Sequence, residues 1–145
     1  MLCYAALGVN RGEPMTALAE GTRNIINAMQ KYGVQRIVYV SAAGCLGERA
    51  GFLLGRLLLW ALPRVSPKAF GAMARQYREV EKSGVQWVAI RPILLDEGPR
   101  TGSYRVPTEG IPNNGFRINT GDVAEFMLKE LASEEYVRKA PALAY

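Results

Sequence analysis

Three short segments carry the residues best suited to bind a flat ligand, and each follows a predicted strand. They are Leu7-Gly8-Val9-Asn10, Ser41-Ala42-Ala43-Gly44 and Pro92-Ile93-Leu94. In open α/β sheets, ligands bind outside the carboxyl ends of the strands, and small residues there let a flat ring approach the backbone. Ser41 is the strongest single candidate, because a serine that ends an apolar strand needs a polar partner. The alternative is that glycine and alanine only turn the chain, and the residues alone favour neither interpretation.

The residue types that many other catalytic sites require are missing from the sequence. There is no histidine, and the two cysteines, Cys3 and Cys45, form no CxxC pair. This excludes the usual zinc sites and the histidine-based triads, so no metal site is expected. Two isolated cysteines form no disulfide framework, which favours a reducing, cytoplasmic compartment.

The charge pattern argues against a partner made of nucleic acid. Eighteen Lys and Arg against thirteen Asp and Glu give a net charge of +5. The cations are scattered singly, so we expect a solvated surface that tolerates anionic small molecules. The most apolar stretch, Gly51 to Leu62, is only twelve residues long and contains Arg56. A bilayer span needs about 20 residues, so the stretch predicts a buried or interface helix and no transmembrane segment.

The elements that would position the three segments alternate between strand and helix. The joint Tyr32-Gly33-Val34-Gln35 returns as Ser83-Gly84-Val85-Gln86, each time between an amphipathic helix and an apolar strand. Two such units predict a parallel α/β sheet with right-handed crossovers. The predicted elements are strands at 1–7, 36–41 and 87–90, and helices at 16–32 and from Ser66-Pro67 to Gly84.

The pattern changes after Pro92. We expect a loop over 95–102, short strands over 104–106 and 116–118, a helix from 121 or 122 to 132, and an edge strand within 135–145. Asp122 is interpreted as a helix-start residue rather than a catalyst, because the dipole and free N–H groups of a first turn favour an acid. No linker interrupts the chain, so residues 1–145 are predicted to form one domain.

Several motifs, taken in order, resemble one known family. They are Ala19-Glu20-Gly21-Thr22-Arg23-Asn24, Val38-Tyr39-Val40-Ser41, Arg91-Pro92, Thr101-Gly102-Ser103-Tyr104 and Asp122-Val123-Ala124-Glu125-Phe126. Together they are similar to the atypical short-chain dehydrogenase/reductases with an NmrA-like NAD(P)-binding domain, and within that family to the biliverdin and flavin reductases. The resemblance covers nearly the whole chain. It implies the C-terminal part of a Rossmann-like, doubly wound parallel α/β sheet, and therefore a partial NAD(P)-binding domain.

The resemblance also implies an activity and a site. The cofactor would be NADP or NAD, and hydride would pass to a flat aromatic small molecule such as a flavin or biliverdin. Ser41 would be the catalytic residue. Core packing is the alternative for three of the implied cofactor contacts, Leu7, Leu18 and Leu94. All the implied cofactor contacts are Leu7, Gly8, Asn10, Leu18, Ser41, Pro92, Ile93 and Leu94.

Three departures from the family pattern bear on that activity. The Gly-rich turn after the family's first strand is missing, so the chain is expected to begin at the fourth strand, with about 70 residues absent. The Tyr-xxx-Lys pair of extended members is absent from Ala69 to Met73, and Tyr77 and Lys82 are five apart, so Tyr77 is interpreted as a core residue. Ile93 stands where the flavin reductases have histidine.

These departures leave three functional hypotheses. The first is a reductase whose activity needs upstream sequence, the second a non-catalytic redox-sensing or partner-binding module, and the third an inactive fragment. The strand at 1–7 would also lose its neighbour, so a second copy or another partner is expected to cover it.

The insertion from Cys45 to Val65 carries a separate hypothesis. Its apolar run, Phe52 to Leu62, follows directly on the loop after Ser41. Such a run is expected to cover a pocket for flat aromatic substrates. The alternative is a helix at a membrane surface or a dimer interface.

Overall fold

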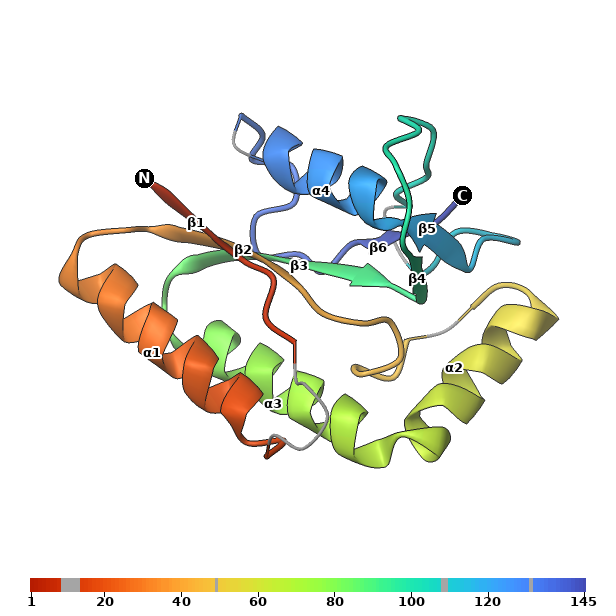
Figure 1. The fold of residues 1–145 in the computed structure, drawn as a ribbon, viewed down its shortest axis with the longest axis horizontal. Helices are drawn as coiled ribbons and strands as arrows, with labels where there is room; N and C mark the ends of the chain where they lie inside the picture. Colours follow the sequence, from red (N-terminus) through yellow and green to blue (C-terminus); the bar gives the residue numbers. More distant parts are fainter. Residues whose placement is uncertain (9–13, 49, 108–109, 131) are drawn as a thin grey trace.

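The sheet at the centre of the molecule is built from four parallel strands. The computed structural model describes residues 1–8, 14–48, 50–107, 110–130 and 132–145. The sheet order is β1 (Leu2–Ala5), β2 (Arg36–Val40), β3 (Gln86–Pro92) and β6 (Ala142–Leu143), with every neighbouring pair parallel (Figure 1). The predicted parallel α/β sheet is therefore confirmed, as is a short edge strand in the C-terminal tail.

Helices cover both faces of this sheet. α1 (Ala17–Lys31) and α3 (Pro67–Lys82) lie on one face, and α4 (Thr120–Lys129) lies on the other (Figure 1). Successive strand side chains point to opposite faces. Tyr39 accordingly packs with residues of α1 and α3, whereas Val38 packs with residues of α4. The strands are apolar on both faces because both faces are covered.

α2 (Leu53–Val65) stands apart from these layers. It lies at one end of the molecule, after the loop that leaves β2, and packs against α3 (Figure 1). Gly55 and Leu59 are its only fully buried residues. The predicted helix in the insertion is thus present, and it has an inner side and an outer side.

The region after Pro92 departs from the predictions in three places. Part of the predicted loop at 95–102 is strand, since β4 (Leu94–Asp96) pairs in parallel with β5 (Arg117–Asn119). The predicted strand at 104–106 is wrong, because only one isolated bridge forms there, from Arg105 to Ala144. The last helix, α4, begins at 120, one or two residues before the predicted start, and ends at 129, three residues before the predicted end. Strands of three residues are too short for alternation to reveal them.

β1 forms one edge of the sheet. It pairs with β2 in the register Cys3 to Ile37, and within the described residues no strand lies on its other side. The edge predicted for residues 1–7 is therefore present, while a partner that covers it stays a prediction. In the part of the chain that the structure describes, no helix is long and apolar enough to cross a membrane.

Candidate functional site

The carboxyl ends of β2 and β3 hold two of the predicted segments together. The Ser41 N–H donates to the carbonyl of Ile90 at 2.8 Å, and the Ala43 N–H donates to the carbonyl of Pro92 at 2.9 Å. These bonds continue the strand pairing beyond Val40. They bring Ser41 beside Pro92 and Ile93, as expected for strands that end at the same edge of a parallel sheet.

The Ser41 hydroxyl has only a weak hydrogen-bond partner within the protein. Its side chain is almost fully buried, and its Oγ lies 3.6 Å from Sγ of Cys45, with either atom able to donate. Sulfur is a weak hydrogen-bond partner. The hydroxyl therefore keeps the capacity to donate to a ligand.

The third segment, after β1, offers backbone access. Gly8 is exposed, and a Cβ at this position would meet no heavy atom within 4 Å. Leu7 is half-buried, with its Cδ1 3.7 Å from the Cβ position of Gly21 in α1. Asn10 lies outside the described residues. A flat group can thus approach the backbone at Gly8 with Leu7 beside it.

The remaining predicted contacts lie deeper in the fold. Leu18 is buried in α1, and Ile93 packs in a cluster with Ala43 and Leu59. Pro92 is buried, and Leu94 is half-buried as the first residue of β4. At Leu18 and Ile93 the side chains serve the core, so any contact they make with a cofactor would come from an edge of the side chain or from the backbone.

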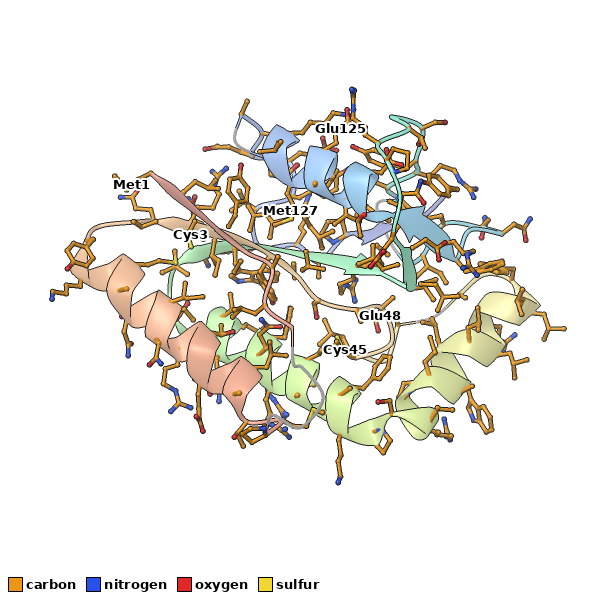
Figure 2. The ribbon with its side chains drawn as sticks, in the orientation of Figure 1. Met1, Cys3, Cys45, Glu48, Glu125 and Met127 are labelled. Carbon is orange, nitrogen blue, oxygen red and sulfur yellow. The ribbon has the colours of Figure 1, made fainter. Side chains whose placement is uncertain are left out.

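A buried ion pair holds the loop that follows Ser41, and sequence reasoning missed it. The Arg91 guanidinium pairs with the Glu48 carboxylate, and both side chains are more than nine-tenths buried. Glu48 also accepts from the N–H of Gly44 at 2.9 Å and of Leu46 at 3.2 Å. Burial lowers the pKa of Arg91 from its ordinary value. The pair ties the loop to the end of β3, with Glu48 and Cys45 on the same loop (Figure 2).

One signal in the sequence points to this pair. Arg91 ends an apolar strand, and a buried guanidinium requires an anionic or carbonyl partner. Its Nε donates to the carbonyl of Ala140 at 2.7 Å. The acid, however, is 43 residues away along the chain.

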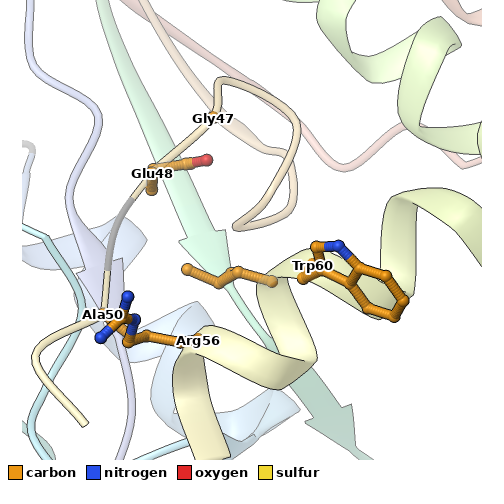
Figure 3. Close-up of a pocket in the computed structure, with 6 residues that line it drawn as sticks. Gly47, Glu48, Ala50, Arg56 and Trp60 are labelled. Atoms are coloured by element: carbon orange, nitrogen blue, oxygen red, sulfur yellow. The ribbon is translucent and has the colours of Figure 1, made fainter. Parts of the chain in front are cut away.

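The same loop forms one wall of a pocket, and α2 forms the other. The pocket has a volume of about 670 Å³ (Figure 3). Leu59 and Trp60 give it an apolar wall, Arg56 supplies a cation, and Glu48 is already engaged by Arg91. Such a pocket fits a flat aromatic molecule with an anionic substituent. The lining residues are Gly47, Glu48, Ala50, Arg56, Leu59 and Trp60.

Tyr77 and Asp122, which were predicted to have structural roles, do not line this pocket. Tyr77 packs edge-on against Trp87 at 5.2 Å between ring centroids, in accord with a core role. Asp122 is buried in the first turn of α4, where it accepts hydrogen bonds from Thr101, Gly102 and Tyr145. Its place in the first turn of α4 is as predicted, but its hydrogen bonds come from the loop at 101–102 and from Tyr145 rather than from the N–H groups of the helix.

The comparison with known families decides the cofactor class. A family model described as NAD(P)H-binding matches residues 2–134. The chain belongs to the NAD(P)H-binding family. A chloroplastic protein of Arabidopsis thaliana whose function is uncharacterised is 29% identical over 119 residues, which make up 79% of this chain and 40% of that protein.

Several solved structures are similar in fold to this NAD(P)H-binding chain. A short-chain dehydrogenase/reductase from Veillonella parvula, in complex with NADP, superposes with a TM-score of 0.77 at 16% identity, over 99% of this chain and 62% of that one. The anaerobilin reductase ChuY from Escherichia coli gives 0.72 at 19% identity, over 99% and 63%. A candidate NADH-flavin reductase from Streptococcus pneumoniae gives 0.76 at 16% identity, over 99% and 70%. These likenesses confirm the Rossmann-like fold. The chain spans less than two thirds of the length of the Veillonella parvula and Escherichia coli proteins.

The residues of this NAD(P)H-binding chain fit part of a dinucleotide. The open space at Gly8 and the weakly partnered hydroxyl of Ser41 suit a flat ring that carries a hydrogen-bonding group. The Gly-rich turn that receives a pyrophosphate has no counterpart in the sequence.

Proposed function

We propose that this chain is the carboxyl-side part of an NAD(P)H-dependent reductase that passes hydride to a flat aromatic acceptor. The observation that carries the proposal is the pocket between the loop after Ser41 and α2. It adjoins the strand ends at which family members of this fold class bind their cofactor. The names of the reductases from Escherichia coli and Streptococcus pneumoniae support a tetrapyrrole or flavin as acceptor.

The residues of this chain have distinct roles in the proposal. Gly8 lets the nicotinamide ring approach the backbone, and Ser41 donates a hydrogen bond that orients the ring. Leu59 and Trp60 pack against the acceptor, while Arg56 attracts its anionic group. When bound, the cofactor supplies the hydride, so little acid–base help is needed from the protein. This suits a chain without the Tyr-xxx-Lys pair.

The proposal also covers the rest of the NAD(P)-binding domain and the compartment in which the reaction takes place. Activity requires the upstream part of the Rossmann sheet, supplied by further sequence, and the edge at β1 is where that part would pair. Residues 1–145 are then one part of an NAD(P)-binding domain. Cys3 and Cys45 are free, which suits a reducing compartment such as the cytoplasm.

The direct test is steady-state oxidation of NADPH and NADH by the protein with its upstream sequence, using FMN and biliverdin as acceptors. Turnover with either acceptor is expected. Tight nucleotide binding without turnover would instead favour a redox-sensing or partner-binding module. The burial of Ile93, where the flavin reductases have histidine, is the observation that favours this second function.

Replacing Ser41 with alanine is expected to weaken nucleotide binding about fivefold, since one hydrogen bond is worth about 1 kcal/mol. The measurement is the Kd for NADPH from quenching of tryptophan fluorescence. Ser103→Ala is the matched control, because Ser103 is exposed and far along the chain from the strand ends. Equal affinities of the two variants would remove Ser41 from the site.

Replacing Trp60 with alanine is expected to raise the KM for the aromatic acceptor by roughly tenfold, because the variant loses a ring that packs on the acceptor. The Kd for NADPH should stay unchanged. Leu53→Ala is the control, since Leu53 lies on the same helix and does not line the pocket. A KM that changes equally in both variants would contradict the assignment of the acceptor to this pocket.

A further inference from the structure

The outer face of α2 is apolar and open to solvent. Leu53 is 82% exposed, Leu57 56% and Trp60 57%. Their spacing of four and three residues places them in one stripe along the helix, opposite the buried Gly55 and Leu59. An amphipathic helix of a soluble protein normally turns such a stripe inwards. A contiguous apolar stripe on the surface marks a binding site.

The segment that contains α2 and most of α3 carries as many positive charges as the net charge of the chain. Residues 50–78 contain five Lys and Arg and no Asp or Glu. Removing these five cations from the eighteen leaves thirteen, which balance the thirteen acids in the rest of the chain. All five cationic side chains are exposed, with two on α2, Arg56 and Arg64, and three on α3, Lys68, Arg75 and Arg78.

We propose that the outer face of α2 binds the surface of an anionic phospholipid bilayer. The helix would lie in the plane of the interface, with Leu53 and Leu57 among the upper parts of the acyl chains and Trp60 and Arg64 at the level of the headgroups. The Arg64 guanidinium stacks on the Trp60 ring at 4.3 Å, which holds a cation at the level of an indole. Indole rings favour the same depth of a bilayer.

The charge pattern favours a lipid surface over a second copy of this chain. A two-fold contact through α2 would place the same patch of each copy against the other. Arg56 and Arg64 would then face like charges without any acid on residues 50–78 to compensate them. Like charges across an interface weaken association. An anionic surface complements both the apolar stripe and the cations.

The bilayer-binding face adjoins the acceptor pocket and shares Trp60 with it. Trp60, Leu59 and Arg56 line the pocket, whereas Leu53 and Leu57 do not. Substitutions at Leu53 and Leu57 therefore test the lipid surface and leave the pocket walls in place.

The experiment is co-sedimentation with vesicles of phosphatidylcholine alone and of phosphatidylcholine mixed with phosphatidylglycerol. Binding to the anionic vesicles, with a blue shift of tryptophan emission, is expected. Trp87 is only 6% exposed, so Trp60 reports the shift. The double variant Leu53→Glu/Leu57→Glu should lose roughly tenfold or more of its partitioning, because buried apolar area and local charge both change. Leu128→Glu, at an exposed leucine of α4, should bind as the unaltered protein does.

Any of three other outcomes would overturn the proposal. Equal binding to neutral vesicles would show that the cations play no part. Absence of binding in a monomeric, folded protein would leave the face without a lipid role. A dimer by light scattering that Leu53→Glu/Leu57→Glu dissociates, without vesicle binding, would assign the face to a second copy. Circular dichroism of the variants shows whether each is folded.

Discussion

Replacing Arg91 with methionine is expected to lower the free energy of unfolding by roughly 3–5 kcal/mol, because it leaves the buried carboxylate of Glu48 without its counter-ion. Arg91 also donates to the carbonyl of Ala140, so the substitution loosens two contacts of β3 at once. Chemical denaturation with urea at neutral pH measures the loss. Arg117→Met is the matched control, because Arg117 pairs with Asp96 and its side chain is 54% exposed. Its loss should be at most about 1 kcal/mol.

A double-mutant cycle with Glu48→Gln isolates the ion pair. The Arg91→Met/Glu48→Gln variant should recover part of the stability lost by Arg91→Met, since the uncompensated charge is then removed. Glu48 also holds the N–H groups of Gly44 and Leu46 and lines the pocket, so both single variants should raise the KM for the acceptor. Additive losses in the cycle, together with an unchanged KM, would mean that the pair positions neither the loop nor the pocket.

The main elements of the fold follow from local patterns. The apolar runs at 36–41 and 87–90 became β2 and β3 because both faces of the sheet are covered. The glycines that end α1 and α3 adopt positive φ, +72° at Gly33 and +77° at Gly84, which is the conformation that lets a chain leave a helix. The apolar periodicity of each segment and the glycine after each helix were therefore sufficient to predict these elements.

The parts that escaped prediction depend on contacts between distant residues. β4 and β5 are three residues each and pair across more than twenty positions, so neither has a periodicity of its own. The Glu48–Arg91 pair joins a loop to a strand end, and only the packing of β2 beside β3 brings them together. For the site, the sequence does not distinguish an apolar side chain in the core from one beside a cofactor, so the contacts predicted for Leu18 and Ile93 stay predictions.

Replacing Asp122 with asparagine is expected to lower the free energy of unfolding by roughly 2–4 kcal/mol at neutral pH, because a buried acceptor of several donors becomes partly a donor itself. Asp122 is 0% exposed. Its two oxygens accept from the N–H groups of Thr101 and Gly102 at 2.8 Å, from the Thr101 hydroxyl at 2.7 Å and from the Tyr145 hydroxyl at 2.6 Å. An amide has one acceptor oxygen, so its NH₂ group would face donors.

The same site predicts how stability depends on pH. Burial alone would raise the pKa of Asp122, but the hydrogen bonds from Tyr145, Gly102 and Thr101 outweigh it and hold the pKa at about 2, against an ordinary 3.8. A carboxyl whose folded pKa is depressed contributes stability above its unfolded pKa and loses it as the pH falls through the folded value. The stability gap between the unaltered protein and Asp122→Asn should therefore narrow from about pH 4 to about pH 2. Urea unfolding at a series of pH values measures this gap.

The control is Glu20→Gln, at an exposed acid in the first turn of α1, which should lower the free energy of unfolding by less than about 1 kcal/mol. A gap for Asp122→Asn that stays constant down to pH 2 would mean that the carboxylate is not the ionised acceptor on which these four hydrogen bonds converge.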